Sequence, residues 1–105
     1  MDLGIAIVCY NTRELTLGCL RSLADALLAD ASAGNPLEVR GCIVDNASTD
    51  HSAAAISELV AVRFPGWEVV SSAENMGFAR GSNLALERLL AAGDPPRHLL
   101  LLTPD

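Results

Sequence analysis

The sequence has no lysine, and its basic residues are scattered along an acidic chain. All seven basic residues are arginines, they stand against thirteen acids, and the formal net charge is −6. A chain with this charge and no arginine cluster is poorly suited to the phosphates of a nucleic acid. Chemistry that needs a lysine side chain, such as that of phosphoacceptor receiver domains, is excluded as well. We therefore expect no nucleic-acid partner.

The sequence also lacks a cysteine framework and a long apolar run. Cys9, Cys19 and Cys42 form no C-x-x-C pair and lie in apolar segments, where cysteine behaves as a small hydrophobe. No apolar stretch reaches the roughly 18 to 20 residues that a membrane span needs, and the N-terminus carries an acid where a signal peptide has basic residues. These features predict a cytoplasmic protein with reduced thiols and no membrane span.

What the chain does have is a regular alternation of short apolar runs and amphipathic segments. Half of its 105 residues are hydrophobic, enough for the core of one domain. The patterns predict strands at 3–9, 37–45, 67–72 and 97–105, and helices at 11–29, 50–64 and 78–93. The order βαβαβαβ predicts an α/β fold with a Rossmann-like, mostly parallel sheet and helices on both faces.

Local motifs predict how the first two helices begin. Asn11 followed by Glu14 resembles a capping box, with asparagine in place of serine or threonine. Ser48 or Thr49 is the expected N-cap of the second helix, and Asp50 adds a favourable charge in its first turn. These polar residues could therefore have a purely structural role.

Polar clusters follow all four predicted strands, and parallel strands bring such clusters to one edge of the sheet, where ligands bind. Neither G-x-G-x-x-G nor G-x-x-x-x-G-K-[ST] is present, which disfavours a dinucleotide-binding domain or a P-loop. Tyr10 and Asn11 could instead flank a nucleobase, and Asp45 could accept a hydrogen bond from a base or a ribose. The strand-end clusters are Tyr10 and Asn11; Asp45 and Asn46; Asn75, Gly77 and Arg80; and Thr103, Pro104 and Asp105.

Four segments carry a family resemblance: "VCYNTRELTLGCLRSL", "VDNASTD", "NMGFARGSN" and "LLLLTPD". In this order they resemble the N-terminal, nucleotide-sugar-binding half of a family 2 glycosyltransferase of the GT-A fold, over essentially the whole chain. The N-x-G-F form is similar to bacterial members that transfer rhamnose, galactofuranose or related sugars. The resemblance implies transfer of a sugar from a UDP or dTDP donor to a glycan or lipid-linked polysaccharide precursor, in the cytoplasm or peripherally at the inner membrane.

The resemblance also implies roles for individual residues. The implied nucleotide-binding residues are Tyr10, Asn11, Asp45, Asn46 and Arg80. Gly77 and Asn83 are implied as supports of the loop that follows the third strand. Asp105 matches the last acid of a D-x-D motif that binds a divalent metal, Mg²⁺ or Mn²⁺, bridging the two donor phosphates. Thr103 stands where that motif has its first acid, which is a departure from the family pattern.

The resemblance also implies an acceptor-binding half after the segment that matches Asp105, and this half carries the catalytic base in such enzymes. No residue among 1–105 can be assigned as that base, so we expect a truncated nucleotide-binding domain that is inactive alone. Truncation would expose apolar surface and favour a homodimer through it. Two alternatives stay open: a non-catalytic nucleotide-binding or regulatory module of the same fold, and a different α/β protein whose strand-end acids are only caps and turns.

Overall fold

The computed structural model describes residues 1–34 and 36–104 and confirms the predicted order of elements. The first strand matches its predicted range, and the later strands are shorter than predicted. The strands are β1 (Leu3–Cys9), β2 (Val39–Asp45), β3 (Glu68–Ser71) and β4 (His98–Leu102), and the helices are α1 (Arg13–Ser32), α2 (Ser52–Arg63) and α3 (Gly77–Leu90).

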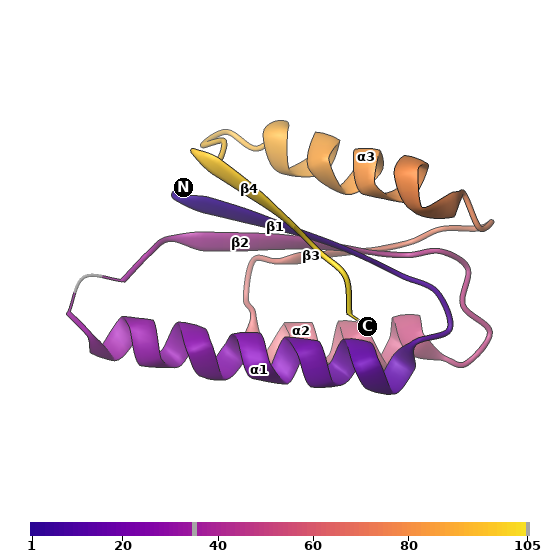
Figure 1. Ribbon diagram of the computed structural model, residues 1–105, viewed down its shortest axis with the longest axis horizontal. Helices are drawn as coiled ribbons and strands as arrows, with labels where there is room; N and C mark the ends of the chain where they lie inside the picture. Colours follow the sequence, from indigo (N-terminus) through magenta and orange to yellow (C-terminus); the bar gives the residue numbers. More distant parts are fainter. Residues whose placement is uncertain (35, 105) are drawn as a thin grey trace.

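The four strands form one parallel sheet in the order β3-β2-β1-β4. Helices α1 and α2 cover one face of this sheet and α3 covers the other (Figure 1). The chain first steps outward from β1 to β2 and β3, and then crosses back to place β4 on the other side of β1. The strand order therefore reverses at β1, and ligands of such sheets bind beside the carboxyl ends of the strands at this point.

The core has two layers because successive side chains of a strand point to opposite faces. On the α1 and α2 face, Ile7 and Ile43 pack with Leu20 and Ile56, and all four are fully buried. On the α3 face the packed residues are smaller, with Ala6, Val8, Cys42, Val44, Ala85 and Leu89. The smaller side chains let α3 lie close to the sheet.

At Gly81, α3 lies close to the sheet and to the turn after β2. A Cβ atom at this position would lie 2.9 Å from Cγ1 of Val8 and 3.0 Å from Nδ2 of Asn46. A comparable contact occurs at the other end of the sheet, where the ring of Trp67 covers Gly41. Glycine is needed at both positions because a Cβ atom would clash with the neighbouring side chains.

The predicted capping box at the start of α1 is wrong. The helix begins at Arg13, and Thr12 in the N-cap position makes no side-chain cap. The side chain of Asn11 turns away from the helix and accepts a hydrogen bond from the backbone N–H of Thr49, at 2.8 Å. A bond to a distant loop has therefore replaced the local cap that the motif favours.

The predicted N-cap of α2 is wrong as well. The helix begins at Ser52, further along the chain than Ser48 and Thr49. A carboxylate oxygen of Asp50 accepts the N–H of Ser52 at 3.0 Å and also the Ser52 hydroxyl proton. Asp50 was expected in the first turn of this helix, and it instead lies before His51, the N-cap residue, from where its carboxylate still accepts the first N–H of α2.

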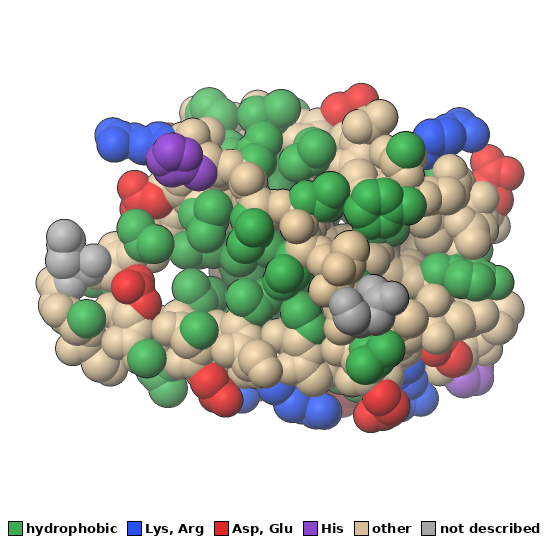
Figure 2. All heavy atoms as spheres, viewed as in Figure 1, with side chains coloured by type: hydrophobic (Ala, Val, Ile, Leu, Met, Phe, Trp, Pro, Cys, Tyr) green, Lys and Arg blue, Asp and Glu red, His purple; other side chains and the backbone are tan. Residues whose placement is uncertain are grey.

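The outer edge of the sheet is apolar and open. Strand β4 has no neighbour on one side within the described chain, and Leu99, Leu100 and Leu101 are 42%, 42% and 43% exposed. Figure 2 shows hydrophobic side chains gathered on this face, between α1 and α3. A strand that is apolar on both faces is typical of the middle of a covered sheet. The composition of β4 therefore fits a more enclosed position than the one it occupies.

The three cysteines are free thiols, as expected. Among the described residues, no helix combines the length and the apolar character needed to cross a membrane.

Candidate functional site

A cleft of about 280 Å³ opens at the carboxyl edge of the sheet, where the strand order reverses. It receives residues from the ends of β1, β2 and β4 and from the start of α3. Its lining residues are Val8, Cys9, Tyr10, Thr12, Asn46, Asn75, Gly77, Phe78 and Pro104. The predicted gathering of strand-end residues at one edge is therefore confirmed.

Two half-exposed aromatic rings line this cleft, Tyr10 at 47% and Phe78 at 51%. The chain contains only four aromatic residues. The other two, Phe64 and Trp67, pack against each other with ring centroids 4.3 Å apart. Exposed rings leave apolar faces free to stack on a planar ligand. The two aromatic rings that are not used in the core are thus both available in the cleft.

The start of α3 forms another wall of the cleft, and Asn46 holds it in place. The side chain of Asn46 accepts the N–H of Met76 at 3.3 Å and donates to the carbonyl of Gly77 at 3.1 Å. Asn75 accepts the N–H of Gly77 at 2.8 Å, and Gly77 has a φ of 79°, which favours glycine. Asn46 is only 2% exposed, and both ends of its amide bond to the start of α3, so the side chain supports the loop.

The first turn of α3 has the properties of an anion-binding helix end. Within the described chain the backbone N–H groups of Phe78 and Ala79 have no acceptor, and the turn contains no acid. Free N–H groups and the helix dipole both favour negative charge at this position. Arg80 adds a cation to the same turn, although its side chain is exposed and does not line the cleft.

Asp45 lies at the end of β2 and is 1% exposed. Its Oδ1 accepts the Ser48 hydroxyl at 2.5 Å, and its Oδ2 accepts the Ser48 N–H at 3.1 Å. The thiol of Cys9, on the neighbouring strand, lies 3.5 Å from the same Oδ1. The carboxylate therefore organises the turn that follows β2.

That turn is joined to the turn after β1 by hydrogen bonds at three points. The Asn11 N–H donates to the Ser48 hydroxyl at 2.9 Å, and the Asn11 side chain accepts from Thr49. The N–H of Arg13 donates to Asp50 at 3.2 Å, so one carboxylate accepts the first N–H of both α1 and α2. Hydrogen bonding by the Ser52 hydroxyl, together with these N–H donors, lowers the pKa of Asp50.

Backbone strain is concentrated in the same two turns. In residues 1–34 and 36–104, the non-glycine residues with positive φ are Asn11 at 50°, Ala47 at 62° and His51 at 63°. Such conformations cost free energy and persist where surrounding contacts hold them, commonly at functional sites. The strain therefore points to the same edge of the sheet as the cleft.

The cleft does not contain an activated thiol. Burial, followed by the neighbouring carboxylate of Asp45, raises the pKa of Cys9 to about 12. Burial likewise raises the pKa of Cys42 to about 11. Both thiols are protonated at neutral pH, and a nucleophilic cysteine requires the opposite shift.

The structure brings some of the predicted site residues together and leaves others outside. Tyr10, Asn46 and Gly77 line the cleft, and Asn11 lies beside it with its side chain turned to the β2 turn. Asn83 lies on the exposed face of α3 and makes no side-chain hydrogen bond in the described part of the chain, so the loop-supporting amide observed is that of Asn46.

Sequence reasoning assigned no role to Phe78. The residue stands on the helical stripe that contains Gly81, Ala85 and Leu89, a pattern that favours a core position. This stripe extends past the edge of the sheet, so Phe78 at its start reaches the cleft and not the core. The position of Phe78 directly after the loop glycine Gly77 was the sequence signal that could have indicated this.

Asp105, the implied metal ligand, lies outside the described residues. Within the described part, no three His, Cys, Asp or Glu side chains gather in a way that could hold a metal ion. Thr103 supplies only a hydroxyl at this end of β4. The described residues therefore do not form a metal centre by themselves.

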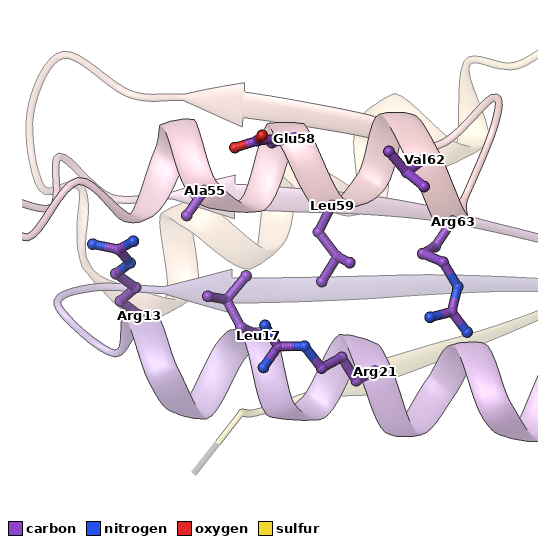
Figure 3. Close-up of a pocket in the computed structure, with 8 residues that line it drawn as sticks. All are labelled: Arg13, Leu17, Arg21, Ala55, Glu58, Leu59, Val62 and Arg63. Carbon is purple, nitrogen blue, oxygen red and sulfur yellow. The ribbon is translucent and has the colours of Figure 1, made fainter.

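A second, larger groove of about 480 Å³ lies between α1 and α2 (Figure 3). Leu17 and Leu59 point toward each other from the two helices, and charged side chains lie around them. Arg63 in this groove is paired with Asp25 at 3.6 Å. None of its lining residues belongs to a strand end, so the cleft at the sheet edge is the candidate site.

Comparison with known proteins gives a family and two structural relatives. The family model "Glycosyl transferase family 2" matches residues 4–102. The structure of S. aureus TarS residues 1–349, solved with UDP, is similar with a TM-score of 0.76 and 23% identity, covering 100% of this chain and 28% of that one. No curated protein sequence matches significantly.

A second solved structure is the mannosyltransferase PcManGT from Pyrobaculum calidifontis, in complex with GDP-Man and Mn²⁺. Its TM-score is 0.58 at 20% identity, and the match covers 83% of this chain and 24% of that one. This chain thus spans about a quarter of the length of both relatives. The likenesses establish the GT-A fold, and the family model covers nearly all residues. The chain belongs to glycosyl transferase family 2.

Proposed function

We propose that this chain is the donor-binding part of a glycosyltransferase that moves a sugar from a nucleoside diphosphate to a glycan or lipid-linked polysaccharide precursor. One observation carries the proposal: the cleft at the reversal of strand order combines exposed aromatic rings with the free N–H groups of a helix start. A nucleoside diphosphate has the matching parts, since its base is planar and its phosphates are anionic.

In the proposed complex the base stacks on Tyr10 and the diphosphate lies toward the first turn of α3. Arg80, exposed and without an ion pair in the described chain, is the proposed cation beside the phosphates. Oδ1 of Asp45 already accepts the Ser48 hydroxyl and the Cys9 thiol, so Oδ2 is the proposed acceptor of a base N–H. Asp45 is 1% exposed and does not line the cleft, so this contact requires the turn after β2 to open. UDP in the TarS structure supports a uracil nucleotide as the first ligand to test.

A divalent metal, Mg²⁺ or Mn²⁺, is part of the proposal, with Asp105 as its protein ligand. The Mn²⁺ in the mannosyltransferase structure supports it. Thr103, at the position of the missing acid, favours the alternative of a non-catalytic nucleotide-binding module that does not need the metal. Both candidates use the same cleft, and they differ in whether binding depends on the metal.

Calorimetric titration of the chain with UDP, dTDP and GDP, each with and without Mn²⁺, tests these proposals. Metal-dependent binding of UDP or dTDP supports the donor-binding function, and metal-independent binding supports the non-catalytic module. Absence of binding for every nucleotide under both conditions overturns the two together. Because no catalytic base can be assigned in this chain, we expect binding without sugar transfer, and measurable transfer would contradict that part.

A further inference from the structure

We infer that Ser48 is a positioning residue of the nucleotide site, one that fixes Tyr10 and Asp45 relative to each other. This inference rests on the proposed function, because it concerns how the same cleft is kept ready for a nucleotide. Ser48 itself does not line the cleft. It acts through the residues on either side of it.

The hydroxyl of Ser48 links the two turns that follow β1 and β2. It donates to Oδ1 of Asp45 at 2.5 Å and accepts the backbone N–H of Asn11 at 2.9 Å. Asn11 directly follows Tyr10, so the bond fixes the peptide that carries the ring. A single oxygen atom thus connects the buried acid of one turn to the aromatic residue of the other.

The backbone around this hydroxyl needs such a connection. Asn11 and Ala47, on the two linked turns, both have positive φ, and Ala47 immediately precedes Ser48. Without side-chain restraints, both residues would relax toward the more populated negative φ region. The bonds from Thr49 to Asn11 and from Arg13 to Asp50 also join the two turns, but neither of them reaches the N–H of Asn11 or the carboxylate of Asp45.

Rigidity matters here because Tyr10 is half exposed and has little packing of its own. A ring that is already in place loses less conformational entropy when a base stacks on it. Loss of the Ser48 hydroxyl should therefore weaken nucleotide binding. It should also lower the free energy of unfolding, because the buried carboxylate of Asp45 loses a donor, whereas the packed cluster that contains Ile7 and Ile43 loses no contact.

The chain provides its own reporters for this test. Tyr10 is the only tyrosine and Trp67 the only tryptophan. Trp67 donates its indole N–H to the carbonyl of Val39 near the start of β2, at the opposite end of the sheet from the cleft. In NMR spectra of protein labelled in the tyrosine ring and in the indole nitrogen, Tyr10 and Trp67 each give their own resonances. A local change at the cleft shifts only the Tyr10 resonances, whereas a change of the whole fold also shifts the Trp67 resonance.

The experiment compares Ser48→Ala, Ser48→Thr and the control Ser57→Ala, which removes a hydroxyl from the exposed face of α2. We expect Ser48→Ala to shift the Tyr10 ring resonances, leave the Trp67 resonance in place and weaken UDP binding about tenfold, the effect of losing one good hydrogen bond. Ser48→Thr keeps the hydroxyl and should restore both properties. Ser57→Ala should match the unchanged protein.

Several results would overturn the inference. They are an unchanged Tyr10 signal in Ser48→Ala, an unchanged affinity in that variant, or a failure of Ser48→Thr to restore either property. If Ser48→Ala does not fold, Ser48→Cys replaces the hydroxyl by a thiol, a weaker hydrogen-bond partner, and should give a smaller Tyr10 shift and a smaller loss of affinity. If the unchanged protein binds no nucleotide, the proposed function fails, and the Tyr10 shift in the free protein still decides whether Ser48 positions the ring.

Discussion

Replacement of Tyr10 by alanine should weaken nucleotide binding and lower the stability of the fold only moderately. The residue is 47% exposed and its hydroxyl makes no hydrogen bond in the described chain, so the loss comes from the covered half of the side chain and should not exceed about 2.5 kcal/mol. A tyrosine side chain buries about 200 Å² when fully covered, which leaves about 100 Å² open here. A stacked base would cover about half of that open area, one face of the ring.

About 50 Å² of newly covered apolar surface corresponds to about 1.3 kcal/mol at roughly 25 cal/mol per Å². Base–aromatic stacking in other proteins is worth about 1–3 kcal/mol by alanine substitution, which agrees in size. We therefore expect Tyr10→Ala to weaken UDP binding by a factor of roughly 10, within about 5 to 30. Tyr10→Phe keeps the ring and should bind like the unchanged protein.

The assay is calorimetry with UDP on the three proteins, together with urea unfolding of each. Equal affinity for Tyr10→Ala and the unchanged protein would refute the stacking argument. So would a Tyr10→Phe variant as weak as Tyr10→Ala, because the hydroxyl and not the ring would then carry the contact. A large loss of unfolding free energy in Tyr10→Ala would show that the ring belongs to the core.

Three further predictions concern stability and association. Gly41→Ala should lower the free energy of unfolding by about 1–3 kcal/mol, because the new methyl group overlaps the Trp67 ring, and urea unfolding measures it, with UDP affinity unchanged in the folded protein. The open edge of β4 should drive self-association of this chain, and Leu100→Lys should shift the sedimentation profile toward monomer; identical profiles would contradict the role of that edge. The pKa of Asp50 is lowered in the folded state, so its contribution to stability is present above the unfolded value near 3.8 and is lost as pH falls through the folded value. We therefore measure the free energy of unfolding by urea at a pH above 3.8 and at a pH below the folded pKa of Asp50. Between these two pH values Asp50→Asn should lose less of its unfolding free energy than the unchanged protein does.

The fold was predictable because the signals for it are long and redundant. Seven alternating segments point to one arrangement, and errors of a few residues at their ends do not alter it. The run of leucines in β4 gave a correct strand, but its pattern could not show that the strand lies at an open edge. Periodicity reports which faces are apolar, and it carries no information about which neighbours are present.

The details of the site were less predictable because they depend on contacts between distant turns. Asn11 and Glu14 have the spacing of a capping box, yet the Asn11 side chain bonds to Thr49 across the sheet edge. Asn46 was expected to contact a nucleotide, and its amide is occupied in holding the start of α3. Sequence spacing describes bonds along one helix, whereas these bonds join segments that meet only after folding.

The absence of a side chain at Gly81 determines how closely α3 packs against the sheet, and so affects the width of the cleft. Because α3 rests there against Val8 and Asn46, the height of the helix above the sheet also fixes how far its first turn stands from the end of β1. Any larger residue at this position would act as a spacer and lift the whole helix. If a nucleotide spans the Tyr10 ring and the α3 amides as proposed, Gly81 sets the length of ligand that fits although it contacts neither group. A larger residue at this position should then change the selectivity among donors of different size.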